Sequence, residues 1–168
     1  MLELDSTFCK VPKSACSTLK EQAIGSATRI PKVNVLINDR MQLLNVILTG
    51  RNIHDSEPAI KLFYNVDIAG KKILADKAYS CQAIRDYLEK LSSVVCIPDK
   101  STFKTKYTFD AELYKQRKLV ERFFQRIKNF RHFRHISTRF DKLATCFENF
   151  VLLAACVQPL IPARRLLS

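Results

Sequence analysis

Apolar and polar residues alternate in three segments of the first 50 residues, which is the period of two that is typical of β-strands. Residues 1–8 read MLELDSTF, residues 32–39 read KVNVLIND and residues 41–50 read MQLLNVILTG. The last two segments meet at Asn-Asp-Arg, residues 38–40, so we expect them to form a β-hairpin. Residues 9–31 are polar and rich in Ser, Lys and Pro, which predicts an irregular basic loop.

The pattern changes to alternating strands and helices in residues 54–99. We expect a short helix from HDSEPAIKLFYNV, residues 54–66, with Asp55 or Ser56 as its cap. Ile73 to Ala75 form a compact apolar strand that ends at Asp76, and SVVCIPD, residues 93–99, forms another. The residues between these strands, CQAIRDYLEKLS, have helical spacing. The expected inward-facing side chains of that helix are Ile84, Tyr87, Leu88 and Leu91. A strand, helix, strand unit predicts parallel strands with a right-handed crossover.

Helical spacing dominates the rest of the chain. A long basic helix is expected to begin near Asp110, a plausible N-cap, and to include YKQRKLVERFFQRIK, residues 114–128. A last helix is expected over residues 141–157. Its predicted inward-facing side chains are Leu143, Phe147, Phe150 and Val151. Together these elements predict an α/β fold with a mixed sheet flanked by helices.

The charge balance narrows the class of partner. The chain has 168 residues and a formal net charge of +12, with a pI of about 9.6. This excess favours a polyanion, above all nucleic acid, over a basic surface with no role. The six cysteines form no CxxC pair and no secretory leader precedes them, which predicts free thiols in a reducing cytosol rather than a zinc site. FVLLAACV, residues 150–157, is too short to span a bilayer.

Three carboxylates stand out against this basic background. Glu121 is the one acidic residue of the stretch 114–128, and Asp5 and Asp76 each follow an apolar strand. Taken alone, Arg117 and Glu121 are an ordinary helical surface pair, and aspartates at strand ends are common in turns. Taken together, three carboxylates in a basic protein are the donors that a hard ion such as Mg²⁺ prefers beside a phosphate substrate. The sequence alone does not show that they meet.

The spacing Y-x2-R-x3-E-x6-K, formed by Tyr114, Arg117, Glu121 and Lys128, resembles the YREK signature of DDE transposases from bacterial insertion sequences. Further stretches are also similar to that family. They are LDST, LTGRNIHDSEP, LADKAYS, LYKQRKLVERFFQRIKNFRH and STRFDKLATCFENFVLLAA. The resemblance implies a ribonuclease H-like fold. It also implies that Asp5, Asp76 and Glu121 are catalytic residues that bind two Mg²⁺ or Mn²⁺ ions.

The resemblance implies DNA contacts as well. Tyr114, Arg117 and Lys128 would contact or orient the DNA of the transposon ends, and Lys118 and Arg122 would extend the same basic surface. His54 resembles a recurrent family position near the site, although a lone His is more often structural or capping. The expected partners are double-stranded DNA, as transposon ends and target, and further copies of the chain assembled on it. No membrane is expected.

The implied activity is metal-dependent strand cleavage and strand transfer during DNA transposition, in a bacterial, cytoplasmic and nucleoid-associated protein. We expect a catalytic domain at residues 1–158, without the N-terminal end-binding segment of relatives, and a divergent tail at residues 159–168. The alternative is a catalytically inactive basic nucleic-acid-binding protein or a decayed transposase fragment. Co-location of the three carboxylates distinguishes these two hypotheses.

Overall fold

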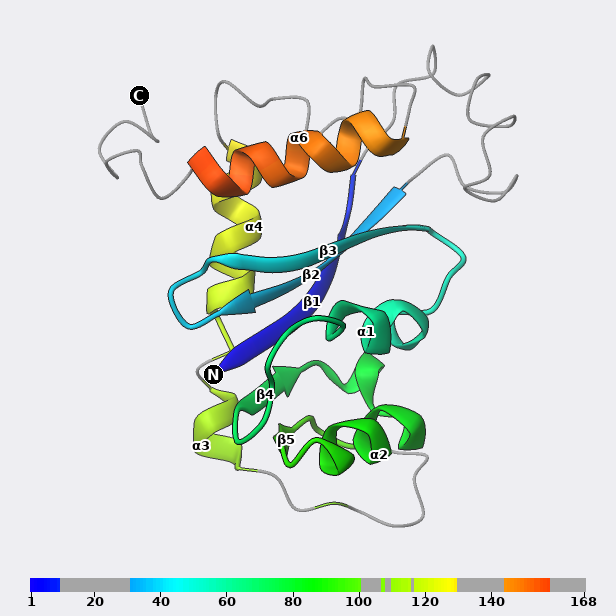
Figure 1. Cartoon of the computed structure of the whole chain (residues 1–168), viewed down its shortest axis with the longest axis vertical. Helices are drawn as coiled ribbons and strands as arrows, with labels where there is room; N and C mark the ends of the chain where they lie inside the picture. The colour runs from blue at the N-terminus through cyan, green and yellow to red at the C-terminus, as the bar shows by residue number, and fades with distance from the viewer. Residues whose placement is uncertain (10–30, 101–106, 108–109, 116, 130–143, 158–168) are drawn as a thin grey trace.

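A five-stranded mixed sheet is the centre of the computed structural model of this chain (Figure 1), which describes residues 1–9, 31–100, 107, 110–115, 117–129 and 144–157. The strands are β1 (Leu2–Phe8), β2 (Pro31–Asn38), β3 (Leu43–Gly50), β4 (Lys72–Ala75) and β5 (Val94–Cys96), in the order β3-β2-β1-β4-β5. β1, β2 and β3 pair antiparallel, whereas β1 with β4 and β4 with β5 pair parallel. The expected α/β fold is confirmed, including the hairpin and the parallel crossover.

The hairpin forms because Asn38 supplies its turn with an acceptor. The side-chain oxygen of Asn38 accepts hydrogen bonds from the amides of Arg40 and Gln42, at 3.0 and 2.9 Å. Met41 adopts a positive φ of 57°, which closes the turn. An Asn side chain that bonds to the backbone two residues on is a common turn device. It fixes the register of β2 against β3.

Helices cover both faces of the sheet. They are α1 (Ser56–Leu62), α2 (Gln82–Lys90), α3 (Ala111–Tyr114), α4 (Leu119–Asn129) and α6 (Ala144–Val157), with a 3₁₀ turn η3 (Lys77–Tyr79) after β4. Figure 1 shows α6 and α4 on the opposite side of the β1–β3 strands from α1 and α2. The strands of the sheet therefore carry apolar side chains on both faces, one toward each layer of helices.

Two buried clusters correspond to these layers. The first joins alternate residues of β2 to α4 and α6. Its members include Val35, Ile37, Phe123, Ile127 and Phe147. The second joins β1 and β4 to α1 and α2. Its members include Leu4, Leu36, Leu62, Ile73 and Ile84. The alternation within β2, with Val35 in one cluster and Leu36 in the other, is the period of two that the sequence shows.

Two local expectations are corrected. Leu91 was expected to face inward, but it follows the last residue of α2 and its side chain is 40% exposed. Asp55 stands at the expected cap position of α1, but its side chain makes no capping hydrogen bond because it is bonded elsewhere. Ile84 and Leu88 are buried and Phe147 and Val151 face the core, as expected. The loop at residues 10–30, Leu143 and the tail at 159–168 lie outside the described residues.

Candidate active site

The polar side chains of the central strand β1 face helix α4. Glu3, Asp5 and Thr7 lie on the same face of β1, because successive side chains of a strand alternate. Each one is hydrogen-bonded to α4 or to the turn before it. Glu3 accepts from the amide of Val120, Asp5 from Arg117, and Thr7 from Lys128. The strand that carries the first predicted catalytic residue is therefore joined at three places to the segment that carries Glu121.

Asp5 is a half-buried carboxylate with two donors. Its Oδ1 accepts from the amide of Ser6 at 2.8 Å, and its Oδ2 accepts from Arg117 Nη1 at 3.2 Å. Burial raises the pKa of Asp5, although the Ser6 amide and Arg117 oppose the rise. The negative charge of Asp76 raises the pKa of Asp5 further. Asp5 thus lies where a second positive charge would be strongly favoured.

Arg117 connects two of the three predicted catalytic residues. Its Nη1 lies 3.2 Å from Asp5 Oδ2, and its Nη2 lies 3.8 Å from Glu121 Oε1. Burial lowers the pKa of Arg117, but the negative charges of Asp5 and its neighbours outweigh burial and the net shift is upward. The neighbours are Asp76 and Glu121, together with Tyr114, whose phenolate forms only at the high pH at which arginine titrates. All three predicted carboxylates therefore act on a single guanidinium group.

Asp76 lies at the same end of the sheet as Asp5. The parallel register pairs Leu4 with Ala75, so Asp5 and Asp76 are the next residues on β1 and after β4. The carboxyl ends of parallel strands are where sites form in such sheets. The Asp76 carboxylate accepts from the amide of Lys77 at 2.6 Å, which caps the η3 turn and fixes the side chain at the strand end.

The segment around Glu121 differs from the expected continuous helix. Asp110 is the N-cap, as expected, and its side chain accepts from the amide of Leu113 at 2.9 Å. The helix ends at Tyr114, and a new helix, α4, begins at Leu119. The Y-x2-R-x3-E-x6-K spacing from Tyr114 to Lys128 therefore spans two helices instead of one. Arg117 follows α3 and precedes α4, and it contacts Asp5.

Glu3 was not identified from the sequence. Its side chain is fully buried, and its Oε2 accepts from the amide of Val120 at 2.9 Å. Burial raises the pKa of Glu3, against the lowering effect of the Val120 amide and of Arg117. The alternation LELD favours Glu3 as a solvent-facing residue. A central strand has helices on both faces, however, so both sets of side chains are buried.

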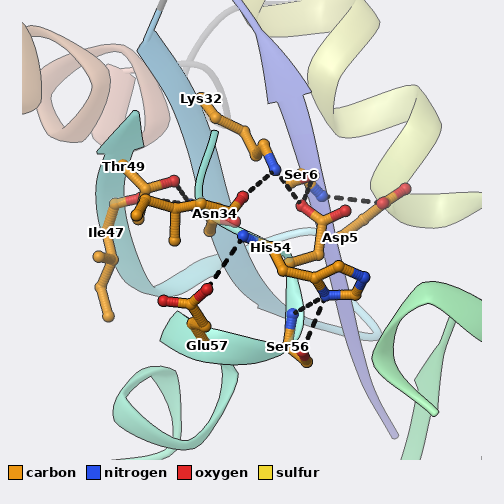
Figure 2. A network of polar contacts seen from close by, with 11 residues as sticks. Asp5, Ser6, Lys32, Asn34, Ile47, Thr49, His54, Ser56 and Glu57 are labelled. Carbon is orange, nitrogen blue, oxygen red and sulfur yellow. Dashed lines mark hydrogen bonds and ion pairs between the residues drawn. The ribbon is translucent and has the colours of Figure 1, made fainter. Parts of the chain in front are cut away.

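A second polar network supports the other face of β1 (Figure 2). The buried Lys32 of β2 lies 2.9 Å from Asp55 Oδ1, and its ammonium also donates to the carbonyl of Ile53 at 2.7 Å. Ser6, the residue after Asp5, donates to the same Asp55 oxygen at 2.7 Å. The network holds the start of α1 against the strand that carries Asp5. The residue one position before Asp55 is His54.

His54 itself is exposed. Its ring Nδ1 lies 2.8 Å from Ser56 Oγ, as Figure 2 shows, and its amide contacts Glu57 at 3.4 Å. These contacts organise the start of α1, which is the structural role that a lone His most often has. The role of His54 near the site remains a prediction.

The candidate DNA-contacting residues lie along α3, the turn and α4. Lys118 and Arg122 are exposed, and Tyr114 is half-buried with the Arg117 guanidinium 5.9 Å from its ring centre. Lys128 is half-buried and donates to Thr7 Oγ1 at 2.5 Å. Of these basic side chains, Arg117 contacts the predicted carboxylates directly and Lys128 contacts the strand that carries Asp5. Their role in DNA binding stays a prediction.

The donors match a hard divalent ion in their chemistry, because all three are carboxylates. Within the described ranges, however, no group of three or more His, Cys, Asp or Glu side chains is gathered closely enough to hold a metal ion. The guanidinium of Arg117 contacts both Asp5 and Glu121 and offsets part of their charge.

Comparison with known proteins assigns the chain to a protein family. The model of the family described as "Transposase DDE domain" matches residues 2–157, so the chain belongs to this transposase family. A protein of Brucella ovis described as "Putative transposase for insertion sequence element IS6501" is 33% identical over 86 residues. Those residues are 51% of this chain and 64% of that protein, so the match spans less than two thirds of the relative. No solved structure matches the chain.

The family accounts for the fold and for the general chemistry. A mixed sheet flanked by helices is consistent with the ribonuclease H-like architecture of DDE transposase domains. Proteins of this family generally use divalent metal ions and act on DNA. In the part of the chain that the structure describes, no helix is long and apolar enough to cross a membrane.

Proposed function

We propose that this chain is a transposase catalytic domain of the YREK group, which cleaves DNA strands and transfers them in a metal-dependent reaction. The observation that supports this most directly is the convergence on Arg117. Asp5 from β1 and Glu121 from α4 lie 3.2 and 3.8 Å from this one guanidinium, and Asp76 follows β4 at the strand end beside Asp5. Three separate elements therefore direct carboxylates to one end of the sheet, in a protein with a net charge of +12.

Asp5, Asp76 and Glu121 are the residues that would hold Mg²⁺ or Mn²⁺, and two ions are expected. When bound, such ions lower the pKa of an attacking water or hydroxyl and stabilise the leaving oxygen of a phosphodiester. The protein supplies the placement of the carboxylates. The amide of Ser6 holds one oxygen of Asp5, and the amide of Lys77 holds Asp76. Ligands that are already hydrogen-bonded keep their orientation.

The reaction has two in-line steps on phosphorus. In the first, water attacks the phosphodiester at the transposon end, which breaks the P–O bond and leaves a 3′-OH. In the second, that 3′-OH attacks a phosphodiester of the target and displaces a new 3′-OH. No protein side chain acts as nucleophile. Burial raises the pKa of Tyr114, so its hydroxyl stays protonated at neutral pH and is suited to positioning rather than attack.

The basic residues around the site provide DNA binding. Lys118 and Arg122 carry exposed charges for the DNA backbone, Arg117 contacts Asp5, and Lys128 contacts Thr7 on the strand that carries Asp5. The partners are double-stranded transposon ends and target DNA, with further copies of the chain on the DNA. Such a protein acts at the bacterial nucleoid. Contacts of this kind position the substrate and carry no sequence information themselves.

A protein that binds DNA without cutting it is the second candidate. The observation in its favour is the ion pair of Arg117 with Asp5, which neutralises a carboxylate that catalysis would need. A strand-cleavage assay distinguishes the two. The substrate is supercoiled plasmid that carries the repeats flanking the gene, incubated with the protein and either Mn²⁺ or Mg²⁺. Conversion to nicked circles and linear product is followed on agarose gels.

The proposed function predicts that Asp5→Asn, Asp76→Asn and Glu121→Gln each abolish cleavage, because each removes a carboxylate charge from the shared site. Glu112→Gln is the matched control. Glu112 is an exposed glutamate on α3 that pairs with Lys115, and its loss should leave cleavage unchanged. A chelator should abolish the reaction. Cleavage that survives in Asp5→Asn or in the chelator would refute the proposed metal-dependent site. No cleavage by the wild type with either ion, together with retained DNA binding, would leave the DNA-binding protein.

A further inference from the structure

Helix α4 has no capping acceptor of its own. The residue before its first position is Lys118, whose side chain is a donor only. The first amides of a helix have no partner within the helix, so an acceptor must come from elsewhere. Glu3 of β1 supplies it: its Oε2 accepts from the amide of Val120 at 2.9 Å. A carboxylate at this end of a helix is also favoured by the helix dipole.

The position of this contact relates it to the active site. Glu3 is two residues before Asp5 on the same face of β1, and Val120 is the residue before Glu121. One carboxylate therefore connects the backbone of the strand that carries Asp5 to the backbone of the helix that carries Glu121. The contact fixes where α4 begins relative to β1. An axial shift or rotation of α4 would change the position of Glu121 relative to Asp5.

The second oxygen of Glu3 argues against a role in stability alone. Glu3 is fully buried, and its Oε1 has no hydrogen-bond partner. A buried acceptor without a partner is unfavourable, and a buried carboxylate more so. An apolar residue facing the core formed by Val120 and Phe123 would avoid this cost. What an apolar residue cannot do is accept the amide of Val120.

We infer that Glu3 is a positioning residue for the proposed reaction: by capping α4 from β1, it places Glu121 within reach of the ion that Asp5 and Asp76 bind. The inference rests on the proposed function, because it concerns the third ligand of that metal site. Glu3 is not itself placed among the ligands. Its effect passes through the backbone of α4.

The test compares substitutions of Glu3 with a matched buried residue. Asn34 is also fully buried, uses one side-chain atom in hydrogen bonds to Ile47 and Thr49, and leaves its Oδ1 without a partner. Asn34→Leu therefore removes a comparable buried polar group from the neighbouring strand. The dissociation constant of Mn²⁺ for the whole chain is measured by electron paramagnetic resonance of the free ion. Thermal midpoints and amide exchange at Val120 are measured on the same samples.

Glu3→Leu should weaken Mn²⁺ binding by about tenfold or more, the usual effect of losing a residue that orients a ligand. It should also accelerate exchange of the Val120 amide. Glu3→Gln keeps an acceptor and should retain both properties. Glu3→Asp keeps the charge, falls short of Val120 by one methylene, and should resemble Glu3→Leu. This last variant keeps the test decisive if Glu3→Leu does not fold.

Asn34→Leu should lower the thermal midpoint without changing Mn²⁺ affinity. Equal Mn²⁺ affinity in wild type and Glu3→Asp, with binding intact, would overturn the role of Glu3 and leave the proposed function standing. Equal losses of affinity in Asn34→Leu and the Glu3 variants would also overturn it, because the effect would then follow from destabilisation. Absence of Mn²⁺ binding by the wild type, with and without DNA, would refute the proposed metal site and the inference together.

Discussion

Arg117 is expected to compete with a divalent ion for the carboxylates in the absence of DNA. Its guanidinium lies 3.2 Å from Asp5 and 3.8 Å from Glu121, which are side chains 20% and 58% exposed. An incoming ion must displace these contacts before it can bind both carboxylates. Arg117→Gln removes the competing charge while keeping a side chain of similar polarity. Mn²⁺ should then bind more tightly to the DNA-free protein.

The size of the effect follows from the two contacts. Two unit charges attract by about 4 kcal/mol at 4 Å near a protein surface, and desolvation and side-chain entropy reduce this to about 0.2–1 kcal/mol for an exposed pair. The contact of Arg117 with Glu121 is an exposed pair of this type. The contact of Arg117 with Asp5 is half-buried and therefore stronger. If the two contacts of Arg117 together contribute about 1.4 kcal/mol, removing them in Arg117→Gln should lower the Mn²⁺ dissociation constant about tenfold.

The assay is a titration of Mn²⁺ into wild type, Arg117→Gln and Lys115→Gln without DNA. Lys115→Gln is the control because it removes the same charge at the residue that follows α3, where the Lys115 ammonium pairs with Glu112 at 2.6 Å. Lys115→Gln should leave Mn²⁺ affinity nearly unchanged. If Arg117→Gln binds Mn²⁺ no better than Lys115→Gln, or more weakly than wild type, Arg117 holds the carboxylates in place instead of competing for them.

Three further outcomes are expected. Lys128→Gln should weaken DNA binding and flatten the plot of log affinity against log salt concentration, because fewer counterions are released; an unchanged slope would remove Lys128 from the contact. Tyr114→Phe should retain cleavage, and a trapped tyrosyl–DNA adduct would contradict this. Burial raises the pKa of Cys96, so as pH rises towards 9 iodoacetamide should label exposed Cys146 and Cys156 well before Cys96. Equal labelling of Cys96, Cys146 and Cys156 by mass spectrometry would show that burial does not protect Cys96.

The fold could be predicted because local patterns determine most of it. Alternation defined β1 and the hairpin, and the compact apolar run before Asp76 defined β4. The break between α3 and α4 could not be predicted, because no Gly or Pro marks it in the stretch 114–128. It depends on contacts from β1, which is far away in the sequence. Helical spacing in such a segment does not distinguish one helix from two.

The sequence proposes residues for the candidate site but does not show how they are arranged. Asp5, Asp76 and Glu121 were identified from their places at strand ends and from the family signature. The ion pairs that Arg117 makes with two of them are contacts in space, and the sequence showed only the helical spacing to Glu121. Glu3 escaped prediction because burial on both faces of a central strand is a property of the whole sheet. A single strand pattern contains no information about it.

The central claim is that Asp5, Asp76 and Glu121 share divalent ions beside bound DNA. The most direct measurement is anomalous scattering from Mn²⁺ in crystals of the chain with a DNA duplex. The claim predicts Mn²⁺ peaks ligated by oxygens of all three carboxylates, with Arg117 turned away from Asp5 towards a phosphate. Peaks elsewhere, or an Arg117–Asp5 ion pair that persists beside an ion-free Glu121, would contradict it.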